Sequence, residues 1–389
     1  MLSPEAQLEQ LRRGAAQITR EDELLAKLRL GRPLNVKLGV DPTAPDIHLG
    51  FTVALTKLRQ FQDFGHQAIL IIGDFTAMIG DPSGRSKTRP ALTHDQVMAN
   101  ATTFKEQAFK ILDPARTKVV FNGEWFEMMS FEQVIKLNSR VTLQQMLQRE
   151  DFRKRYDAGE PVHLHEIQYP IMQGWDSVMI KADVELGGTD QLFNILVGRE
   201  LQRAEGLPEQ VVFLNPLLVG LDGVQKMSKS YGNYVGVSED PKTQFGKLMS
   251  ISDETMATYY TLLLSEDQPA GHPMDAKKAL ARRIVERYHG AEAGQAALDN
   301  FNNFAKGDLA ATDLPTVSFE GVNPDIVSLV VHAYAQGFQM TKSRGDARRL
   351  VEQGSVQLGA DKITDPKATP APAAGTVLKL DKTRAIRVG

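Results

Sequence analysis

Short apolar segments alternate with longer amphipathic segments between residues 35 and 214. Strict alternation over 35–40 places Val36, Leu38 and Val40 on one face, which predicts a strand. The other short apolar runs predict strands at 67–73, 118–121, 182–186 and 210–214, of which those at 67–73 and 210–214 are expected to be buried. Helical periodicity between them predicts helices over about 48–64, 93–112 and 163–181. The pattern therefore predicts an α/β fold.

The segments outside this α/β pattern predict additional helices, a linker and the division into domains. Residues up to about Arg32 predict a helical lead-in, and 240–305 predict a helical region. Residues 128–159 predict helices inserted between two halves of the sheet, where homodimer contacts are often built; extra surface helices are the alternative. A Gly-, Pro- and Thr-rich stretch over 307–323 predicts a linker. We expect three domains, over 1–236 with a helical insertion near 128–160, 237–320 and 321–389.

Composition limits the possible functions. The 389 residues suit two or three domains, and the absence of cysteine excludes disulfides and thiolate chemistry. With a net charge of −3, any nucleic-acid contact must come from local basic patches. No apolar run is long enough to span a membrane, and the N-terminus lacks the apolar core of a signal peptide. We therefore expect a cytoplasmic protein.

The stretch from Gly39 to Phe51 joins the first predicted strand to a helix. Its prolines suit a tight loop, and Asp46 stands where the helix N-cap is expected. Free N–H groups at a helix start favour an anion such as phosphate, to which Thr43 and His48 can also donate. Gly50 lets a planar group lie flat against the backbone, because it has no Cβ. The alternative is an ordinary proline-rich loop with a capping or solvated histidine.

A lysine-containing loop follows the last predicted strand, with the sequence LDGVQKMSKSYGN over 221–233. Lys226 and Lys229 flank small residues after an Asp-Gly turn signal. Two ammonium groups on a flexible loop suit a polyphosphate that must be held and then released. A solvated basic loop is the alternative for any single pair of lysines.

A polar row lies within the helix predicted over 163–181. Tyr169, Gln173 and Asp176 are spaced i, i+4 and i+7, which places them on one face. Pro170 either starts this helix or kinks it. Taken alone, such a row is more often a solvated face than a binding site.

Together these motifs resemble the signatures of class I aminoacyl-tRNA synthetases. His48-Leu49-Gly50-Phe51 resembles the HIGH element, and Lys226 to Ser230 is the KMSKS element in full. The row Tyr-x-x-x-Gln-x-x-Asp is similar to that of bacterial tyrosyl-tRNA synthetases, where it lines the tyrosine pocket. The resemblance implies a Rossmann-like catalytic domain, a helical anticodon-side domain and a small C-terminal α+β RNA-binding domain.

The resemblance also implies a set of tyrosine ligands. Tyr169 and Gln173 would bind the amino group of tyrosine, together with Asp81 of the sequence IGDPSG over 79–84. Asp176 would face the phenolic hydroxyl. Lys37 stands where many members carry a tyrosine that bonds this hydroxyl, so we expect Lys37 to pair with Asp176 or to donate to the phenol.

The ATP site is implied in the same way. Lys226 and Lys229 would hold the pyrophosphate, with Thr43 and His48 on the phosphates beside them. The sequence GGTDQ over 187–191 resembles the loop that holds the ATP ribose, where the carboxylate of Asp190 can accept two hydrogen bonds. The expected ATP site also includes Asp41, Gly50, Phe51, Gly188 and Gln191. We expect Mg²⁺ to accompany ATP without a dedicated metal cage in the protein.

Phe51 is a departure from the HIGH pattern, which ends in histidine. Its aromatic ring cannot offer a ring N–H to ATP, so one contact with the nucleotide is in question. Phe51 is followed by Leu55 and Leu58 at helical spacing, so it is alternatively a core residue.

The C-terminal residues 324–389 resemble a small RNA-binding domain shared with a ribosomal protein of the small subunit. A helix opening near Thr341 precedes predicted strands at 354–358, 376–380 and 384–388. Its basic residues would contact tRNA phosphates: Lys342, Arg344, Arg348 and Arg349. A solvated charged helix end is the alternative.

The implied function is tyrosine–tRNA ligase, which forms tyrosyl-adenylate from L-tyrosine and ATP and transfers tyrosine to its tRNA. Two alternatives share the fold: an adenylating paralogue that does not charge tRNA, and an RNA-binding protein without catalysis. The complete KMSKS and GGTDQ elements argue against the second, and the basic terminal domain against the first. The polar row that contains Asp176 favours tyrosine over tryptophan.

Overall fold

The structure is a computed structural model that describes residues 2–81 and 92–389. Within the sequence IGDPSG over 79–84, Pro82 to Gly84 therefore lie outside the described residues. The chain forms two compact units, Met1–Gly294 and Gln295–Gly389. The expected division into three domains stays a prediction.

The first unit is built on a twisted sheet in the strand order β1-β6-β5-β2-β3-β4. Every neighbouring pair is parallel except β1 with β6, which is antiparallel. The predicted α/β fold is confirmed, and the strands are β1 (Gln17–Thr19), β2 (Asn35–Val40), β3 (Gln67–Ile72), β4 (Thr117–Phe121), β5 (Val184–Gly188) and β6 (Val211–Asn215). The lead-in was predicted as helical only, which is wrong for β1, because this short segment completes the edge of the sheet beside β6.

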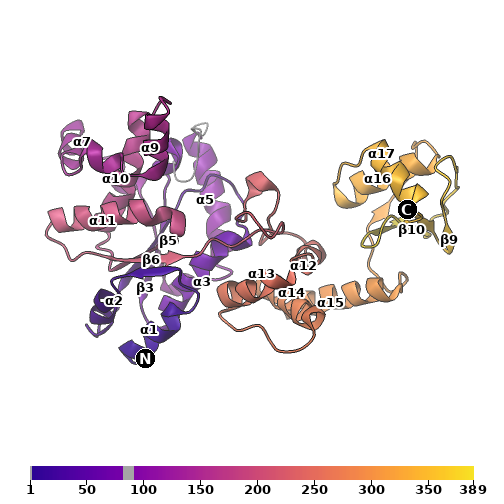
Figure 1. The fold of residues 1–389 in the computed structure, drawn as a ribbon, viewed down its shortest axis with the longest axis horizontal. Coiled ribbons are helices and arrows are strands. Elements are labelled where there is room, and N and C mark those ends of the chain that lie inside the picture. The colour runs from indigo at the N-terminus through magenta and orange to yellow at the C-terminus, as the bar shows by residue number, and fades with distance from the viewer. Residues whose placement is uncertain (1, 82–91) are drawn as a thin grey trace. The chain divides into compact units, whose positions relative to one another are not determined.

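Helices cover both faces of this sheet, as Figure 1 shows, with α10 and α11 on one face and α3 on the other. Strand order reverses between β2 and β5: the chain leaves β2 toward β3 and leaves β5 toward β6. Ligands of open α/β sheets bind beyond the carboxyl ends of the strands at such a reversal. The helices of this part are α1 (Pro4–Arg12), α2 (Glu21–Leu28), α3 (Leu49–Asp63), α4 (Thr76–Ile79), α5 (His94–Ala108), α10 (Leu164–Met179) and α11 (Leu192–Ala204).

Local sequence explains where several helices begin. Thr93 caps α5 in a capping box with Gln96. Pro170 lies inside α10, so it does not start that helix. Helix α3 begins at Leu49 after His48, so Asp46 is not its N-cap as predicted. The expected insertion near 128–160 contains α7 (Phe131–Asn138), α8 (Leu143–Met146) and α9 (Glu150–Asp157), and the short α6 (Gly123–Phe126) precedes it.

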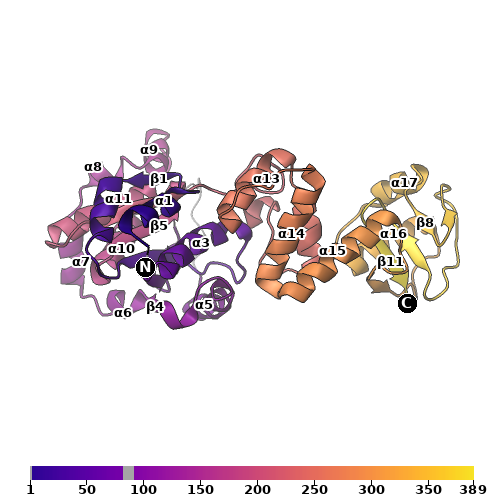
Figure 2. The same cartoon turned by 90° about the horizontal axis from the view of Figure 1, so that it is seen from below.

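The first unit continues into the predicted helical region. Helix α14 packs against α12 and α13, and Figure 2 shows α13 beside α14. Leu248, Tyr259 and Val285 are fully buried in this region. The elements are α12 (Pro241–Met249), α13 (Asp253–Tyr259), the π-helix η4 (Tyr260–Leu264), α14 (Pro273–His289) and α15 (Ala291–Lys306), which runs into the second unit. Over residues 2–81 and 92–389, no helix has the length and apolar character needed to cross a membrane.

The second unit begins with the end of α15 and combines α16 and α17 with a sheet in the order β7-β11-β10-β8-β9. The residues predicted as a linker contain β7, which pairs with β11 because its backbone completes the sheet edge. Buried apolar residues from both helices and the sheet form one core, including Tyr334, Val351 and Ile386. The elements are β7 (Thr316–Val317), α16 (Ile326–Phe338), α17 (Arg344–Glu352), β8 (Gln357–Leu358), β9 (Asp361–Lys362), β10 (Val377–Lys379) and β11 (Ala385–Val388).

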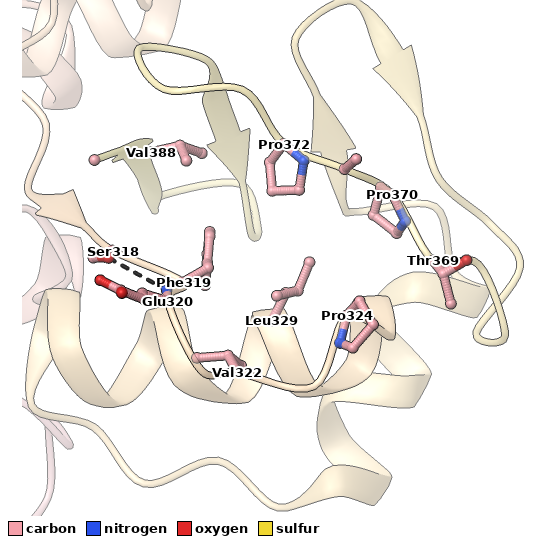
Figure 3. Close-up of a pocket in the computed structure, with 12 residues that line it drawn as sticks. Ser318, Phe319, Glu320, Val322, Pro324, Leu329, Thr369, Pro370, Pro372 and Val388 are labelled. Carbon is pink, nitrogen blue, oxygen red and sulfur yellow. Dashed lines mark hydrogen bonds between the residues drawn. The ribbon is translucent and has the colours of Figure 1, made fainter.

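An open hollow of about 620 Å³ lies within this second unit. Figure 3 shows it between α16, the segment after β7 and a proline-containing loop. Its walls include Phe319, Leu329 and Pro372, and the basic residues expected to bind RNA do not line it.

Candidate active site

The predicted site residues of the first unit gather at the carboxyl ends of β2 and β5. Asp41 directly follows β2, Gly188 ends β5, and α10 carries the polar row. A Cβ on Gly188 would lie 2.6 Å from Oδ1 of Asp190 and 2.9 Å from Cδ2 of Leu217, so a larger residue here would displace both side chains. The strand reversal thus brings together side chains that are up to about 150 residues apart in the sequence.

Tyr169 and Asp41 are in direct contact in the site. The Tyr169 hydroxyl donates to Oδ2 of Asp41 at 2.9 Å, and Thr76 donates to Oδ1 at 2.8 Å. Burial raises the pKa of Asp41 to about 7, despite these hydrogen bonds, and the charge of Asp81 raises it further. Burial, with the carboxylates of Asp41 and Asp81, also raises the pKa of Tyr169, so this residue stays a neutral hydroxyl. Asp41, expected in the ATP site, thus contacts the tyrosine row.

Asp81 contributes a second carboxylate beside this pair. Gln191 donates from Nε2 to Oδ2 of Asp81 at 2.9 Å, and Nη2 of Arg149 lies 3.9 Å from Oδ1. Because the charge of Asp81 raises the pKa of both Asp41 and Tyr169, the three groups share one electrostatic environment. Such an environment favours a cation, and an ammonium group of a substrate satisfies it.

Asp176, at the other end of the polar row, is held by two donors that the sequence analysis did not identify. Trp125 donates from Nε1 to Oδ1 at 3.0 Å, and Asn122 donates from Nδ2 to Oδ2 at 3.3 Å. The side chain is buried, and burial raises the pKa of Asp176 to about 7, although Lys37 opposes this shift. Asn122 follows β4 directly, so the rule that ligands bind beyond strand ends was the signal that could have found it.

Lys37 does not have either of its expected roles. Its side chain is fully buried on β2, and Nζ lies 2.9 Å from Oε1 of Glu185 on β5. Nζ also donates to Ser177 Oγ and to the carbonyl oxygen of Gln173, both at 2.7 Å. These three acceptors match the three N–H bonds of an ammonium group. Lys37 therefore pairs with Glu185 in place of Asp176, and no N–H is left for the phenol.

The predicted HIGH element places an unpaired ring nitrogen at the start of α3. His48 Nδ1 is buried without a hydrogen-bond partner among the described residues. Burial lowers the pKa of His48 to about 4, and the charges of Lys229 and Lys226 lower it further. The imidazole is therefore neutral near pH 7, and its ring N–H can donate to a phosphate oxygen. Thr43 lies in the preceding loop, where its backbone N–H donates to the carbonyl of Asp41 at 2.7 Å.

The HIGH and KMSKS elements are in direct contact. The backbone N–H of Gly50 points to Sδ of Met227 at 3.3 Å, and Leu49 N–H donates to the carbonyl of Val235 at 2.9 Å. A Cβ on Gly50 would lie 3.0 Å from Nδ1 of His48, tighter than nearly all such contacts. The same Cβ would lie 3.3 Å from that of Met227, so a larger residue here would require the two elements to shift by a few tenths of an ångström.

Both lysines of the KMSKS element face carboxylates of the site. Nζ of Lys226 lies 3.3 Å from Oδ2 of Asp190, and Nζ of Lys229 lies 3.9 Å from Oδ2 of Asp46. Asn233, missed in the sequence analysis, holds the loop by accepting from the backbone N–H of Ser228 at 2.8 Å. These ion pairs are partly exposed and weak, so a polyphosphate can displace the carboxylates.

Phe51 packs in the first turn of α3 and is half-buried. Its ring meets that of Phe104 edge-on, with centroids 5.1 Å apart. This contact favours the core interpretation of Phe51 over a missing donor to ATP.

The basic residues expected to bind RNA form ion pairs or an aromatic contact with neighbouring residues of the second unit. Arg344 pairs with Asp325 at 3.2 Å, Arg348 pairs with Glu352 at 2.8 Å, and Arg349 pairs with Asp346. Lys342 lies over the ring of Tyr334, with Nζ 5.3 Å from its centroid. All four belong to α17 or the turn before it, with Arg344 at the start of the helix and Arg349 in its last turn.

Comparison with known proteins agrees with these observations. The family of class I tRNA synthetases for tryptophan and tyrosine matches residues 29–306, more than half of the chain. A protein of Vibrio vulnificus (strain YJ016) named tyrosine–tRNA ligase 2 is 49% identical over 383 residues, covering 95% of each chain. A tyrosine–tRNA ligase of Syntrophotalea carbinolica is also 49% identical, over 407 aligned positions that cover 100% of this chain and 98% of that protein.

Solved structures show the same fold at lower identity. The tyrosyl-tRNA synthetase of Archaeoglobus fulgidus, solved with L-tyrosine, superposes with a TM-score of 0.61 at 22% identity, covering 76% of this chain and 99% of that one. A truncated mitochondrial tyrosyl-tRNA synthetase of Coccidioides posadasii gives a TM-score of 0.62 at 24% identity, covering 77% and 92%. The chain therefore belongs to the bacterial-type tyrosyl-tRNA synthetases, within the class I tRNA synthetases of tryptophan and tyrosine.

Proposed function

We propose that this protein is a tyrosine–tRNA ligase whose tyrosine pocket runs along α10 from Asp176 to Tyr169. The observation that carries the proposal is the buried Asp176 carboxylate, which faces the site with two N–H donors holding it. Neither alternative, the adenylating paralogue or the RNA-binding protein without catalysis, is favoured by the relatives, which are named tyrosine–tRNA ligase.

Tyrosine is bound at both of its polar ends. Asp176 accepts the phenolic hydroxyl, which phenylalanine lacks, so phenylalanine would leave a buried acceptor unpaired. The ammonium group meets Tyr169, Gln173 and Asp81 at the opposite end of the row. Asp41 orients Tyr169 by accepting a hydrogen bond from its hydroxyl. The lone pairs of that hydroxyl then point toward the substrate.

The first step needs positioning and charge stabilisation more than a nucleophilic side chain. The tyrosine carboxylate attacks the α-phosphate of ATP, the bond to the pyrophosphate breaks, and tyrosyl-adenylate forms. Lys226 and Lys229 stabilise the leaving pyrophosphate, while the neutral His48 ring and Thr43 donate to the phosphates. Asp190 accepts the ribose hydroxyls after Lys226 leaves it for the phosphates. Mg²⁺ enters with ATP as part of that substrate.

In the second step, tyrosine passes from the adenylate to the terminal adenosine hydroxyl of tRNA. The cluster on α17 binds the tRNA backbone. Its arginines are more than 60% exposed, and their ion pairs with Asp325, Asp346 and Glu352 are of the weak surface type. Phosphates can therefore replace these carboxylates at small cost.

The protein acts as a homodimer through its helical insertion. Large apolar side chains are exposed there, including Phe131 at 79% and Met128 at 82%. Leu164, at the start of α10, is exposed at 78%. Apolar residues gathered in one segment mark an interaction surface rather than a solvated face. The cytoplasmic location stays a prediction.

Pyrophosphate exchange into ATP, measured with each amino acid in turn, tests this function. Exchange should depend on tyrosine and be far weaker with phenylalanine or tryptophan, because only tyrosine satisfies Asp176. Equal exchange with phenylalanine would contradict the assignment of the pocket. Charging of tRNA under the same conditions separates the ligase from an adenylating paralogue, which would exchange pyrophosphate without charging.

A further inference from the structure

A fully buried ion pair lies behind the polar row of α10. Lys37 and Glu185 stand on the adjacent parallel strands β2 and β5, in direct register with each other. Their side chains are 0% and 2% exposed, and Nζ lies 2.9 Å from Oε1. Replacing a buried pair by apolar residues often leaves stability unchanged or improves it, so stability alone is a weak reason for its presence.

Glu185 accepts four hydrogen bonds, and one of them comes from Gln173 of the polar row. Oε1 accepts from Lys37 and from Nε2 of Gln173, the latter at 3.1 Å. Oε2 accepts from Ser177 Oγ at 2.9 Å and from Gln210 Nε2 at 2.5 Å. A carboxylate cannot donate, so every neighbour that meets it must present a donor. Gln173 must therefore turn its amide nitrogen toward Glu185.

The carbonyl oxygen of the Gln173 amide also has a partner, and that partner favours the same orientation of the amide. Its Oε1 accepts from Nδ2 of Asn194 at 2.9 Å. Asn194 is oriented in turn, because its Oδ1 accepts from Arg149 at 3.2 Å, and a guanidinium can only donate. An amide can be turned end for end with little change in shape, and only its partners decide which end faces which way. Glu185 and Arg149 therefore fix the amide of Gln173 from opposite ends.

We propose that Glu185, balanced by Lys37, is a positioning residue that keeps Oε1 of Gln173 as an acceptor for the substrate ammonium. A reversed amide would place Nε2 against that ammonium, donor against donor, and Oε1 against the carboxylate. Lys37 neutralises Glu185 and also holds the backbone carbonyl of Gln173 at 2.7 Å, which anchors this turn of α10 to the sheet. The proposal rests on the proposed role of Gln173 in amino-group binding.

Two matched double variants test the acceptor at position 185. Lys37→Met with Glu185→Met removes the ion pair and the acceptor, and methionine fills the space with an unbranched apolar side chain. Lys37→Met with Glu185→Gln removes the charges but keeps a carbonyl oxygen for Gln173. The new amide nitrogen can meet Oε1 of Gln210, which has no hydrogen-bond partner among the described residues.

Pyrophosphate exchange is measured with tyrosine as the substrate. Its deamino analogue, 3-(4-hydroxyphenyl)propionate, serves as a competitive inhibitor of that exchange. In the Met/Met variant, the KM for tyrosine should rise roughly ten- to a hundredfold, the range for a hydrogen bond to a charged group. The inhibition constant of the analogue, the KM for ATP and the preference for tyrosine over phenylalanine should each stay within about threefold. The Met/Gln variant should keep the wild-type preference for tyrosine over the analogue.

Melting curves accompany both variants, because a positioning role predicts lost amino-group recognition in a folded protein. A Met/Met variant that keeps the wild-type preference for tyrosine over the analogue would overturn the proposal. Equal weakening of tyrosine and the analogue would also overturn it, because it would indicate general damage to the pocket. The swapped pair Lys37→Glu with Glu185→Lys gives an independent measurement: it retains an ion pair but places a donor opposite Gln173, so amino-group recognition should again be lost.

The wild-type enzyme separates this inference from the function on which it rests. Wild-type exchange that does not depend on tyrosine would contradict the proposed function. Tyrosine-dependent wild-type exchange with an unchanged preference in the Met/Met variant would contradict only the role of Glu185.

Discussion

Replacement of Asp176 by asparagine should stabilise the folded protein, whereas most substitutions of buried residues destabilise it. The carboxylate is buried, and its pKa rises from 3.8 in the unfolded chain to about 7 in the folded protein. A shift of about three pKa units corresponds to about 4 kcal/mol, by which burial disfavours the ionised form above pH 7. The folded protein binds the proton more tightly, so this cost grows as the pH rises from about 4 to about 7.

Asparagine removes that cost and introduces a smaller one. Its amide has one acceptor oxygen, whereas Trp125 and Asn122 both present N–H groups at this position. Asn122 cannot turn its amide freely, because its Oδ1 accepts from the backbone N–H of Phe75 at 3.1 Å. One donor is then left unpaired at a cost of about 1–3 kcal/mol, and this cost does not depend on pH. At pH 8 we expect Asp176→Asn to stabilise the first unit by about 1–3 kcal/mol.

The pH dependence is the sharper part of this prediction. At pH 5 only a little over one pKa unit of the shift is felt, or about 1.7 kcal/mol, so the advantage of the variant should shrink by about 2–3 kcal/mol between pH 8 and pH 5. Urea unfolding at several pH values measures it, with tryptophan fluorescence as the signal, because both tryptophans, Trp125 and Trp175, lie in the first unit. The same variant should lose its preference for tyrosine over phenylalanine in pyrophosphate exchange. A stability difference that does not change with pH would refute the assigned burial cost of Asp176.

Three further changes probe other parts of the molecule. A chain ending at Lys306 should still form tyrosyl-adenylate, because the pocket residues lie upstream, but should charge tRNA poorly in an aminoacylation assay; full charging would remove the role given to α17. Phe51→His should lower the melting temperature by a few degrees and leave the KM for ATP no better, because it loses the edge-on contact with Phe104, worth about 0.5–1.5 kcal/mol; improved ATP use would instead indicate a missing donor. Phe131→Asp should shift the protein from dimer to monomer in sedimentation, and an unchanged dimer would place the interface elsewhere.

Local patterns in the sequence determined the elements and the motifs. The apolar runs that became β3 and β6 are recognisable because a parallel strand buried on both faces needs consecutive apolar residues. The spacing of Tyr169, Gln173 and Asp176 placed them on one face of α10, because helical periodicity is a property of the backbone alone. The lysine loop was identified from its residue types and its resemblance to a known signature.

Tertiary structure alone decided which side chains meet. Asp41 and Tyr169 are 128 residues apart and form a hydrogen bond only because β2 neighbours β5 and α10 covers that face of the sheet. The same adjacency pairs Lys37 with Glu185, a partner that no local pattern could specify because strand order and register are set by the whole sheet. A single charged residue within an apolar strand signals a buried partner, but its identity depends on which strand lies alongside. The three-residue strand β1 shows the same limit, since its structure comes from pairing with β6 and not from its own sequence.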